Sequence, residues 1–527
     1  MVLGKKENII ILSILFVLAT MITYVQYHKF VHGSPVRADT GFLLEMTENI
    51  ANGKGHISSI HAAMNNFFRN KLQTLPAEEY CDKELGKEEQ EFRVVFESHR
   101  YYITYVTALF AKVFDTKTIY YTTHVFGFFI MLYMLYKILR EAEVPIISSV
   151  LFLSLVFVYP AFSLSMSGQL YAERFFIPFS IIFLYFLNKK DLNLIGLYSS
   201  AFLICLVSER SPLMMGIFIF GYLVLFWNSL EKKRKIHSVV IATALLSFAL
   251  YSMKVLRESN IWYSQGNFMP SSIGDLMARF TNPAFLDNLL VFGIVSFFFL
   301  GVFTLANWKY FLMAFVMMLP NILGNIGGAE KYGYLTHYHT LYFPFLVFAA
   351  VLGYIKLMHK IKENKNYYIS YIFLVGLILL SSSYSPYSRN ISIKNMIDEN
   401  ALLKDINLYP DIFDKHSFLR QYLGNFNKIS DAIPDGAIVT SGEMAQVILW
   451  KNKINYFYPM GIDIADYAVL FVTKVDDKYE YSGVVSYLGA EETKKIDKCM
   501  IERMHKLGYD FENQLIINNF AIIKRKK

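Results

Sequence analysis

Long apolar segments constrain this chain more than any other feature of its sequence. They recur from residue 9 to residue 384. A helix needs about 20 apolar residues to cross the roughly 30 Å hydrocarbon core of a bilayer, so runs of this length predict membrane-spanning helices. The composition agrees, because 54% of the residues are hydrophobic and only 18% are charged. The chain is therefore expected to be a polytopic membrane protein, which excludes an ordinary cytosolic enzyme, a secreted disulfide scaffold and a disordered protein.

The charge balance and the cysteines exclude further classes. The formal net charge is +8 over 527 residues, which is mild and does not indicate nucleic-acid binding. Three cysteines, Cys81, Cys205 and Cys499, are too few for a disulfide framework or for the usual structural zinc sites.

We expect eleven spanning helices, counted from the apolar runs. They fall at residues 9–27, 118–139, 146–166, 171–187, 192–207, 211–228, 236–256, 286–306, 309–326, 337–358 and 366–384. The aromatic stretch 101–114 is too short to cross and is expected to lie along the membrane interface.

The distribution of Lys and Arg predicts the orientation. These residues accumulate in cytoplasmic loops. With eleven spans the cation-rich connections all fall on one side, among them Lys232–Lys235, whereas counting 101–114 as a span would place that run outside. The N-terminus is therefore predicted in the cytoplasm and the C-terminus outside.

Two units follow from this layout. Residues 1–384 are expected to form the transmembrane unit, in which 28–117 is a first outer loop with amphipathic or interfacial helices. Residues 385–527 are expected to form a small extracytoplasmic α/β accessory domain without a glycine-rich phosphate loop. Its predicted helices are 415–433, 442–451 and 491–507; its predicted strands are 437–440, 455–458, 467–473 and a last strand or hairpin within 514–525. Whether Cys81 and Cys499 form a disulfide stays open.

Asp39 stands out in the first outer loop. It precedes an amphipathic stretch in which Phe42, Met46 and Ile50 share one helical face, while Glu45 and Glu48 lie on another. That stretch could rest at the membrane surface and hold Asp39 at the boundary with water. Asp39 could equally cap the helix, since Asp is a favoured N-cap residue. The two interpretations are compatible.

Other candidate residues recur at the outer ends of the expected spans. They are His99, Arg100, Glu173, Arg174, Glu209, Arg210, Lys331, His337 and Tyr338. Structural explanations stay open for each of them: anchoring charges, local ion pairs or an aromatic belt. Ionisable groups beside the apolar phase are nevertheless costly, and they are usually functional or paired. Because such groups are sparse within the spans, the pattern favours a reaction centre at the outer boundary over a conduction path.

The ordered set of motifs resembles the GT-C superfamily of membrane glycosyltransferases, and within it the bacterial family known as domain of unknown function 2079. The motifs are Asp39-Thr-Gly41, Asn52-Gly53-Lys-Gly55, His99, Glu173, Glu209, Pro320–Asn325, His337-Tyr338 and Pro344. The chain departs from the family in two places. Leu170-Tyr171-Ala172 stands where His-Pro often precedes the acid, and Ser208-Glu209-Arg210 replaces a Lys-Glu-Asp-like turn.

The resemblance implies a polyprenyl-phosphate-dependent glycosyltransferase of the bacterial cytoplasmic membrane, acting on the outer face in the making of a cell-envelope glycan. Asp39 would be the catalytic carboxylate, and Arg210, followed by Arg174, Arg100 and Lys331, would hold the phosphate. Glu209, Glu173, His99, His337 and Tyr338 would complete the substrate site.

The partners implied by the resemblance are the polyprenyl-phosphate-sugar donor, membrane lipid, and a glycan, lipid or protein acceptor. No cofactor is certain, and a divalent metal, which some relatives use, stays open. Two alternatives remain: a transporter or flippase of a lipid-linked saccharide, and a non-catalytic membrane assembly protein.

Overall fold

The computed structural model describes most of the chain. The ranges are 5–31, 38–63, 101–159, 171–259, 272–282, 299–323, 337–364, 367–382, 426–442, 445–446, 448–451, 453–475, 478–483, 490–517 and 519–526, with single or paired residues at 75–76, 79, 81, 162, 285 and 289.

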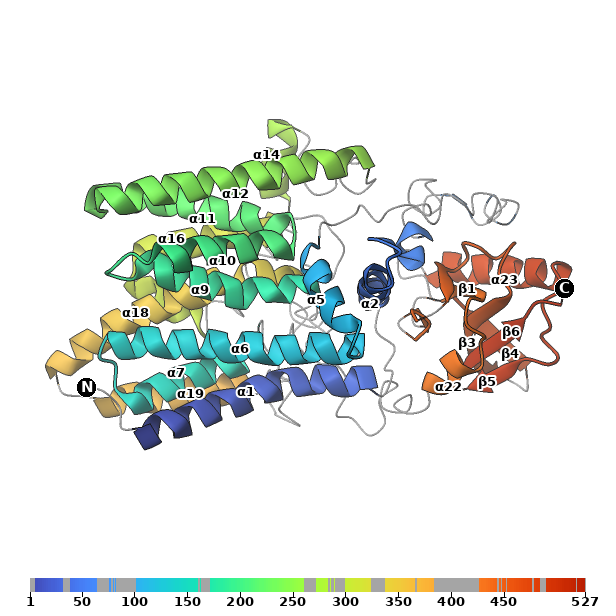
Figure 1. The fold of residues 1–527 in the computed structure, drawn as a ribbon, viewed down its shortest axis with the longest axis horizontal. Coiled ribbons are helices and arrows are strands. Elements are labelled where there is room, and N and C mark those ends of the chain that lie inside the picture. The colour runs from blue at the N-terminus through green and yellow to red at the C-terminus, as the bar shows by residue number, and fades with distance from the viewer. Residues whose placement is uncertain are drawn as a thin grey trace.

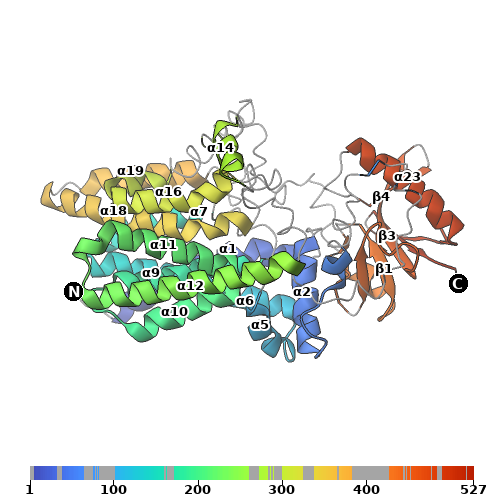
Figure 2. The same cartoon turned by 90° about the horizontal axis from the view of Figure 1, so that it is seen from above.

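Among the described residues, ten helices run side by side along the long axis of the molecule (Figures 1 and 2). They are α1 (Lys5–Val31), α6 (Thr116–Glu141), α7 (Ile146–Val158), α9 (Phe176–Asn188), α10 (Leu194–Val207), α11 (Arg210–Phe226), α12 (Lys232–Ser259), α16 (Trp308–Leu323), α18 (Phe343–Asn364) and α19 (Tyr367–Ser382). Four segments within the described residues are long and apolar enough to cross a membrane: Thr116–Glu141, Arg210–Ser229, Lys232–Val255 and Phe343–Lys362. Most of the predicted spans are α-helical where they are described, but residues 299–306 of the span 286–306 form a turn and a 3-10 helix, η6 (Gly301–Ala306). The count of eleven stays a prediction, and most of 286–306 lies outside the described residues.

Several boundaries differ from those predicted. The run 171–187 opens with a 3-10 turn, η3 (Ala172–Phe175), and the run 337–358 opens with another, η7 (His337–Leu341). The basic run 232–235, predicted as a connection, forms the first turn of α12. Lys and Arg are good helix formers, so the helix extends through them beyond its apolar part.

The stretch 101–114 contains only a short helix, α5 (Ile103–Ala111), of nine residues. At 1.5 Å per residue such a helix is about 14 Å long, less than half of a bilayer core. The prediction that this stretch does not cross the membrane agrees with that length.

The two ends of the bundle carry different contacts and elements. At one end the Arg234 guanidinium donates to the carbonyl oxygens of Lys189 and Lys190 at 2.6 and 3.0 Å, and the Lys362 ammonium pairs with Glu143 at 2.9 Å. The other end, here called the sheet end, carries α2 (Ala38–Ala51), α5 and the C-terminal sheet (Figure 1). In both views α2 crosses the direction of the bundle helices. Which membrane face each end meets stays a prediction.

The C-terminal part is an α/β domain, as expected. Its strands are β1 (Ile438–Ser441), β2 (Ile454–Phe457), β3 (Tyr467–Val475), β4 (Lys478–Ser482), β5 (Leu515–Ile517) and β6 (Phe520–Lys524). The sheet order is β2-β1-β3-β6-β5, with β4 paired to β3. Strands β1, β2 and β3 are parallel, whereas β6 runs antiparallel to β3. In the described part of this region, two helices accompany the sheet, α22 (Phe426–Asp431) and α23 (Ala490–Lys506), and α23 buries Ile496, Met500 and Met504 along one face.

Two expectations for this domain were wrong. The described residues of 442–451 form turns rather than a helix, with amide-to-carbonyl bonds from Ala445 to Gly442 and from Ile448 to Ala445. Gln446, Leu449 and Trp450 are all buried, so the segment lacks the solvent-facing side of a surface helix. Strand β4, whose residues are half-buried or exposed, was missed although Tyr479 and Tyr481 alternate with polar residues, which is the pattern of a strand.

A disulfide between Cys81 and Cys499 ties the first loop to α23. The Arg503 guanidinium lies beside it and donates to the Cys81 carbonyl oxygen at 3.4 Å. Cys205 on α10 is a free thiol. The question that the sequence left open is thus answered by the structure.

Close helix packing generates a first prediction. A Cβ atom at Gly353 on α18 would overlap the carbonyl oxygen of Phe303, whereas one at Gly376 on α19 would meet nothing within 4 Å. Gly353→Ala should destabilise the fold by about 1–3 kcal/mol through overpacking, while Gly376→Ala should be neutral or slightly stabilising because Ala favours helix. The thermal midpoints of the detergent-solubilised variants measure this difference, and equal midpoints would contradict the packing described.

The disulfide generates a second prediction. Denatured wild-type protein that has not been reduced should take up one maleimide label, at Cys205, and reduced protein should take up three. Cys205→Ser should take up none before reduction, while Cys81→Ser should take up two because Cys499 is released. Mass spectrometry counts the labels, and three labels on unreduced wild type would show that the bridge does not form.

Candidate functional site

Four charged residues predicted from the sequence are buried together with a tyrosine at the sheet end. Glu173 and Arg174 belong to η3, and Glu209 and Arg210 lie where α11 begins. Glu173, Arg174 and Glu209 have no solvent exposure, whereas Arg210 retains 8%. Tyr101 lies two residues before α5, which contacts α2. We call Tyr101 and these four residues the buried cluster.

Two direct contacts lie within the cluster. The Tyr101 hydroxyl donates a hydrogen bond of 2.7 Å to Glu173 Oε1. Arg210 Nε lies 3.7 Å from Glu209 Oε1. Burial raises the pKa of Tyr101 well above its ordinary value; the charges of Glu173 and Glu209 also raise it, and the charge of Arg210 opposes them. Tyr101 therefore remains a protonated hydrogen-bond donor, and both acids and Arg210 act on it.

The four charged residues of the cluster lie where α9 and α11 begin. Pro212 lies in the first turn of α11, where its missing N–H costs nothing. Ser208 and Ser211 share a hydrogen bond of 3.0 Å across that turn. The N-terminus of a helix carries free N–H groups and a partial positive charge, so it favours anions. The starts of α9 and α11 and the two guanidinium groups place positive charge at this end of the bundle. The carboxylates of Glu173 and Glu209 offset that charge.

The 3-10 turn η7 lies against the same region. It contacts η3, α9 and α11. His339, in η7, is buried, and its Nδ1 lies 3.2 Å from the Tyr342 hydroxyl. The backbone of His337 and Tyr338 belongs to η7, but their side chains lie outside the described part of the chain.

Helix α2 brings Asp39 to the sheet end. The helix begins at Ala38, so Asp39 is its second residue and not its N-cap, and the capping interpretation is corrected. An acid in the first turn still interacts favourably with the helix dipole. The Asp39 side chain lies outside the described residues. Further along α2, Thr47 shares a 2.7 Å hydrogen bond with the hydroxyl of Tyr120 on α6, which fixes α2 to the bundle.

Three further predicted site residues lie outside the part of the chain that the structure describes: His99, Arg100 and Lys331. The structure therefore brings together Glu173, Arg174, Glu209 and Arg210, whereas convergence of Asp39, Arg210 and His337 on one cavity stays a prediction. Sequence reasoning missed the role of Tyr101. Its aromatic context indicated only an interfacial anchor, and nothing in the local sequence indicates a bond to a residue 72 positions away.

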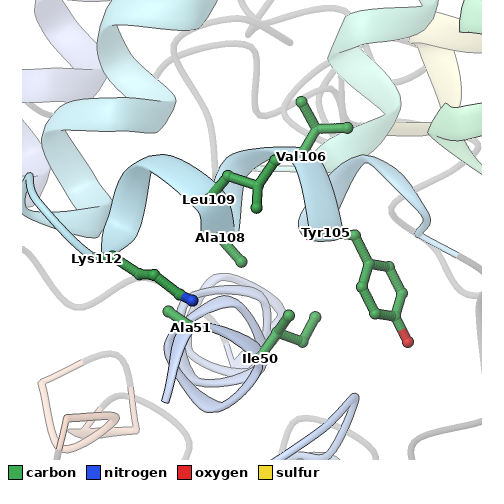
Figure 3. Close-up of a pocket in the computed structure, with 7 residues that line it drawn as sticks. All are labelled: Ile50, Ala51, Tyr105, Val106, Ala108, Leu109 and Lys112. Atoms are coloured by element: carbon green, nitrogen blue, oxygen red, sulfur yellow. The ribbon is translucent and has the colours of Figure 1, made fainter. Parts of the chain in front are cut away.

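A shallow apolar cavity of about 310 Å³ opens between α2 and α5. Figure 3 shows Lys112 of α5's C-terminal end extending over Ala51 at one side, and Tyr105 at the other. Leu109, which also lines the cavity, is 67% exposed. An apolar surface with a cation at its edge suits contact with a lipid tail and its head group.

Metal binding finds no support among the described residues. No three His, Cys, Asp or Glu side chains of that part of the chain lie close enough together to hold an ion. Within the cluster, Glu173 accepts from Tyr101 and Glu209 lies beside Arg210. We therefore derive no step through a metal.

No protein-family model matches the chain, and no curated protein matches it in sequence. Among solved structures it is similar in fold to ArnT from Cupriavidus metallidurans. The apo form has 10% sequence identity and a TM-score of 0.45, covering 90% of this chain and 98% of ArnT. The form bound to undecaprenyl phosphate has 9% identity and a TM-score of 0.45, covering 92% and 100%. Because these TM-scores lie below 0.5, we rest no conclusion about function on the likeness.

Proposed function

We propose that the protein is a membrane glycosyltransferase that moves a sugar from a polyprenyl-phosphate donor to an acceptor at the sheet end of its helical bundle. The observation that carries the proposal is the buried cluster. Ionisable side chains beside an apolar phase are expensive and persist where they are paired or functional. Here two arginines and two glutamates lie at helix starts, and the sequence motifs that contain them resemble those of GT-C glycosyltransferases.

The phosphate of the donor would bind at Arg210. This guanidinium retains slight exposure, so an incoming anion can reach it, and guanidinium groups bind phosphate through paired charge-assisted hydrogen bonds. Glu209 holds Arg210 from one side, and Arg174 adds a second buried positive charge. Arg100, Lys331, His99, His337 and Tyr338 are proposed to line the same site. The apolar surface of α5 offers the polyprenyl tail a path along the membrane.

Asp39 is the proposed catalytic base. Its carboxylate would accept the proton of the acceptor hydroxyl while that oxygen attacks the anomeric carbon. The new bond joins the acceptor oxygen to the anomeric carbon, and the bond from that carbon to the phosphate oxygen breaks. The leaving polyprenyl phosphate keeps the electron pair, and its charge is stabilised by Arg210. We place this reaction on the outer face of a bacterial cytoplasmic membrane, where a glycan, lipid or protein would be the acceptor.

Replacement of Asp39 tests the proposal. In purified protein in lipid nanodiscs, Asp39→Asn should lower transfer of labelled sugar from a polyprenyl-phosphate donor by about 10²–10⁴-fold, the usual contribution of a general base. Asp115→Asn is the matched control. Asp115 caps α6 by accepting from the Thr118 amide at 3.1 Å, and Asn caps equally well.

Three results would decide against the assignment. Full transfer by Asp39→Asn would remove Asp39 as the base. If wild type transfers no sugar but moves a lipid-linked saccharide across vesicle membranes, and Asp39→Asn does the same, the protein is a transporter. If wild type does neither, a non-catalytic assembly role replaces the enzyme.

A further inference from the structure

Glu45 is a buried acid of α2 that the proposed reaction does not use. It is 4% exposed, and its two oxygens accept four hydrogen bonds from the next segment of the chain. These come from the Ser58 hydroxyl at 2.6 Å, the Ser59 hydroxyl at 2.5 Å, the Ser59 amide at 3.0 Å and the Ile60 amide at 3.3 Å. Burial raises the pKa of Glu45 and these hydrogen bonds oppose the rise. The carboxylate thus satisfies the free amides where a short helical turn begins, as an N-terminal anion does.

Ser59 links this arrangement to the C-terminal domain. Its hydroxyl oxygen accepts a hydrogen bond of 3.0 Å from the backbone amide of Asn455 in β2. Strand β2 is at the edge of the sheet, where amides that point outward need a partner. Ser59 therefore bonds to Glu45 on one side and to the sheet edge on the other.

The helical geometry of α2 shows that it is held from two sides. Gly41 and Glu45 are four residues apart and share a face. A Cβ at Gly41 would lie 3.1 Å from the carbonyl oxygen of Gln446, so this face touches the C-terminal domain directly. Thr47 is two residues beyond Glu45, about 200° around the helix, and it bonds to Tyr120 of the bundle.

We propose that Glu45 and Ser59 are positioning residues through which the C-terminal domain sets the place of α2 and, with it, of Asp39. The expected effect on catalysis rests on the proposed function. The docking of the C-terminal domain on α2 does not depend on it. The disulfide from Cys81 to Cys499 keeps the domain close to the first loop, whereas Glu45 and Ser59 fix its contact with α2. In this proposal the C-terminal domain contributes to the catalytic site by positioning α2.

Hydrogen–deuterium exchange tests the docking without any activity. Ser59→Ala should speed exchange of the β2 peptide around Asn455 and of the first turns of α2 by about tenfold or more, because local opening becomes easier. Ser58→Ala is the matched control, since it removes one bond to Glu45 and one from the His61 amide and leaves the contact of Ser59 with Asn455 intact. Unchanged exchange at β2 and α2 in Ser59→Ala would overturn the proposal.

Transfer kinetics test the positioning role. Glu45→Gln and Ser59→Ala should lower kcat about tenfold or more with little change in KM for the lipid donor, because the phosphate site at Arg210 is untouched. Glu45→Asp, which keeps the carboxylate, should recover part of the rate. Faster exchange with an unchanged kcat would refute positioning of Asp39. If wild type transfers no sugar, the proposed function fails, and exchange in α2 alone decides whether the domain holds this helix.

Discussion

Burial of charge at the end of an apolar bundle is the constraint on which the rest of this structure depends. A hydrocarbon environment cannot solvate a carboxylate or a guanidinium, so such groups must lie at its edge and find partners. Here Glu173 and Arg174 lie where α9 is about to begin, and Glu209 and Arg210 lie where α11 begins. The Tyr101 hydroxyl joins them from the adjoining interfacial stretch. The bundle thereby assembles one polar centre from segments far apart in the sequence.

Helix α2 connects this centre to the rest of the sheet end. It lies across the direction of the bundle (Figure 2), and it carries Asp39 in its first turn. The apolar side chains within residues 42–46 of this helix are buried in the hydrophobic core and anchor it by packing. Individual polar contacts add to this packing, to Tyr120 on the bundle side and through Glu45 and Ser59 on the domain side. Because these contacts act over short distances, we expect a shift of the C-terminal domain to move α2 and the Asp39 that it carries.

The sequence predicted the elements better than it predicted the contacts between them. Apolar runs placed α6 and α11 within a few residues, because length and hydropathy alone decide whether a helix can cross a bilayer. The strands β1, β2 and β3 followed from short apolar runs. The turns in place of a helix at 442–451 were not predictable, because the burial of that segment on all sides depends on elements distant in the chain.

The candidate site shows the same difference between residues that the sequence can select and contacts that depend on the fold. Glu173, Arg174, Glu209 and Arg210 could be selected because charges are rare at span ends. Glu45 could not, since an amphipathic pattern places it on a face other than the apolar one and gives no sign that it is covered. The pairing of Cys81 with Cys499, separated by 418 positions, likewise depends on the fold.

The most direct measurement of the central claim is the binding of a polyprenyl phosphate to the purified protein by native mass spectrometry. The wild type should retain undecaprenyl phosphate, and Arg210→Gln should lose at least about tenfold in affinity, since a charge-assisted contact contributes about 1.5–3 kcal/mol. Arg279→Gln, which removes the same charge from an ion pair with Asp275 on α14 (Ile273–Thr281), should bind as the wild type does. Equal binding by all three proteins would contradict the account, because the buried cluster would then not be the phosphate site.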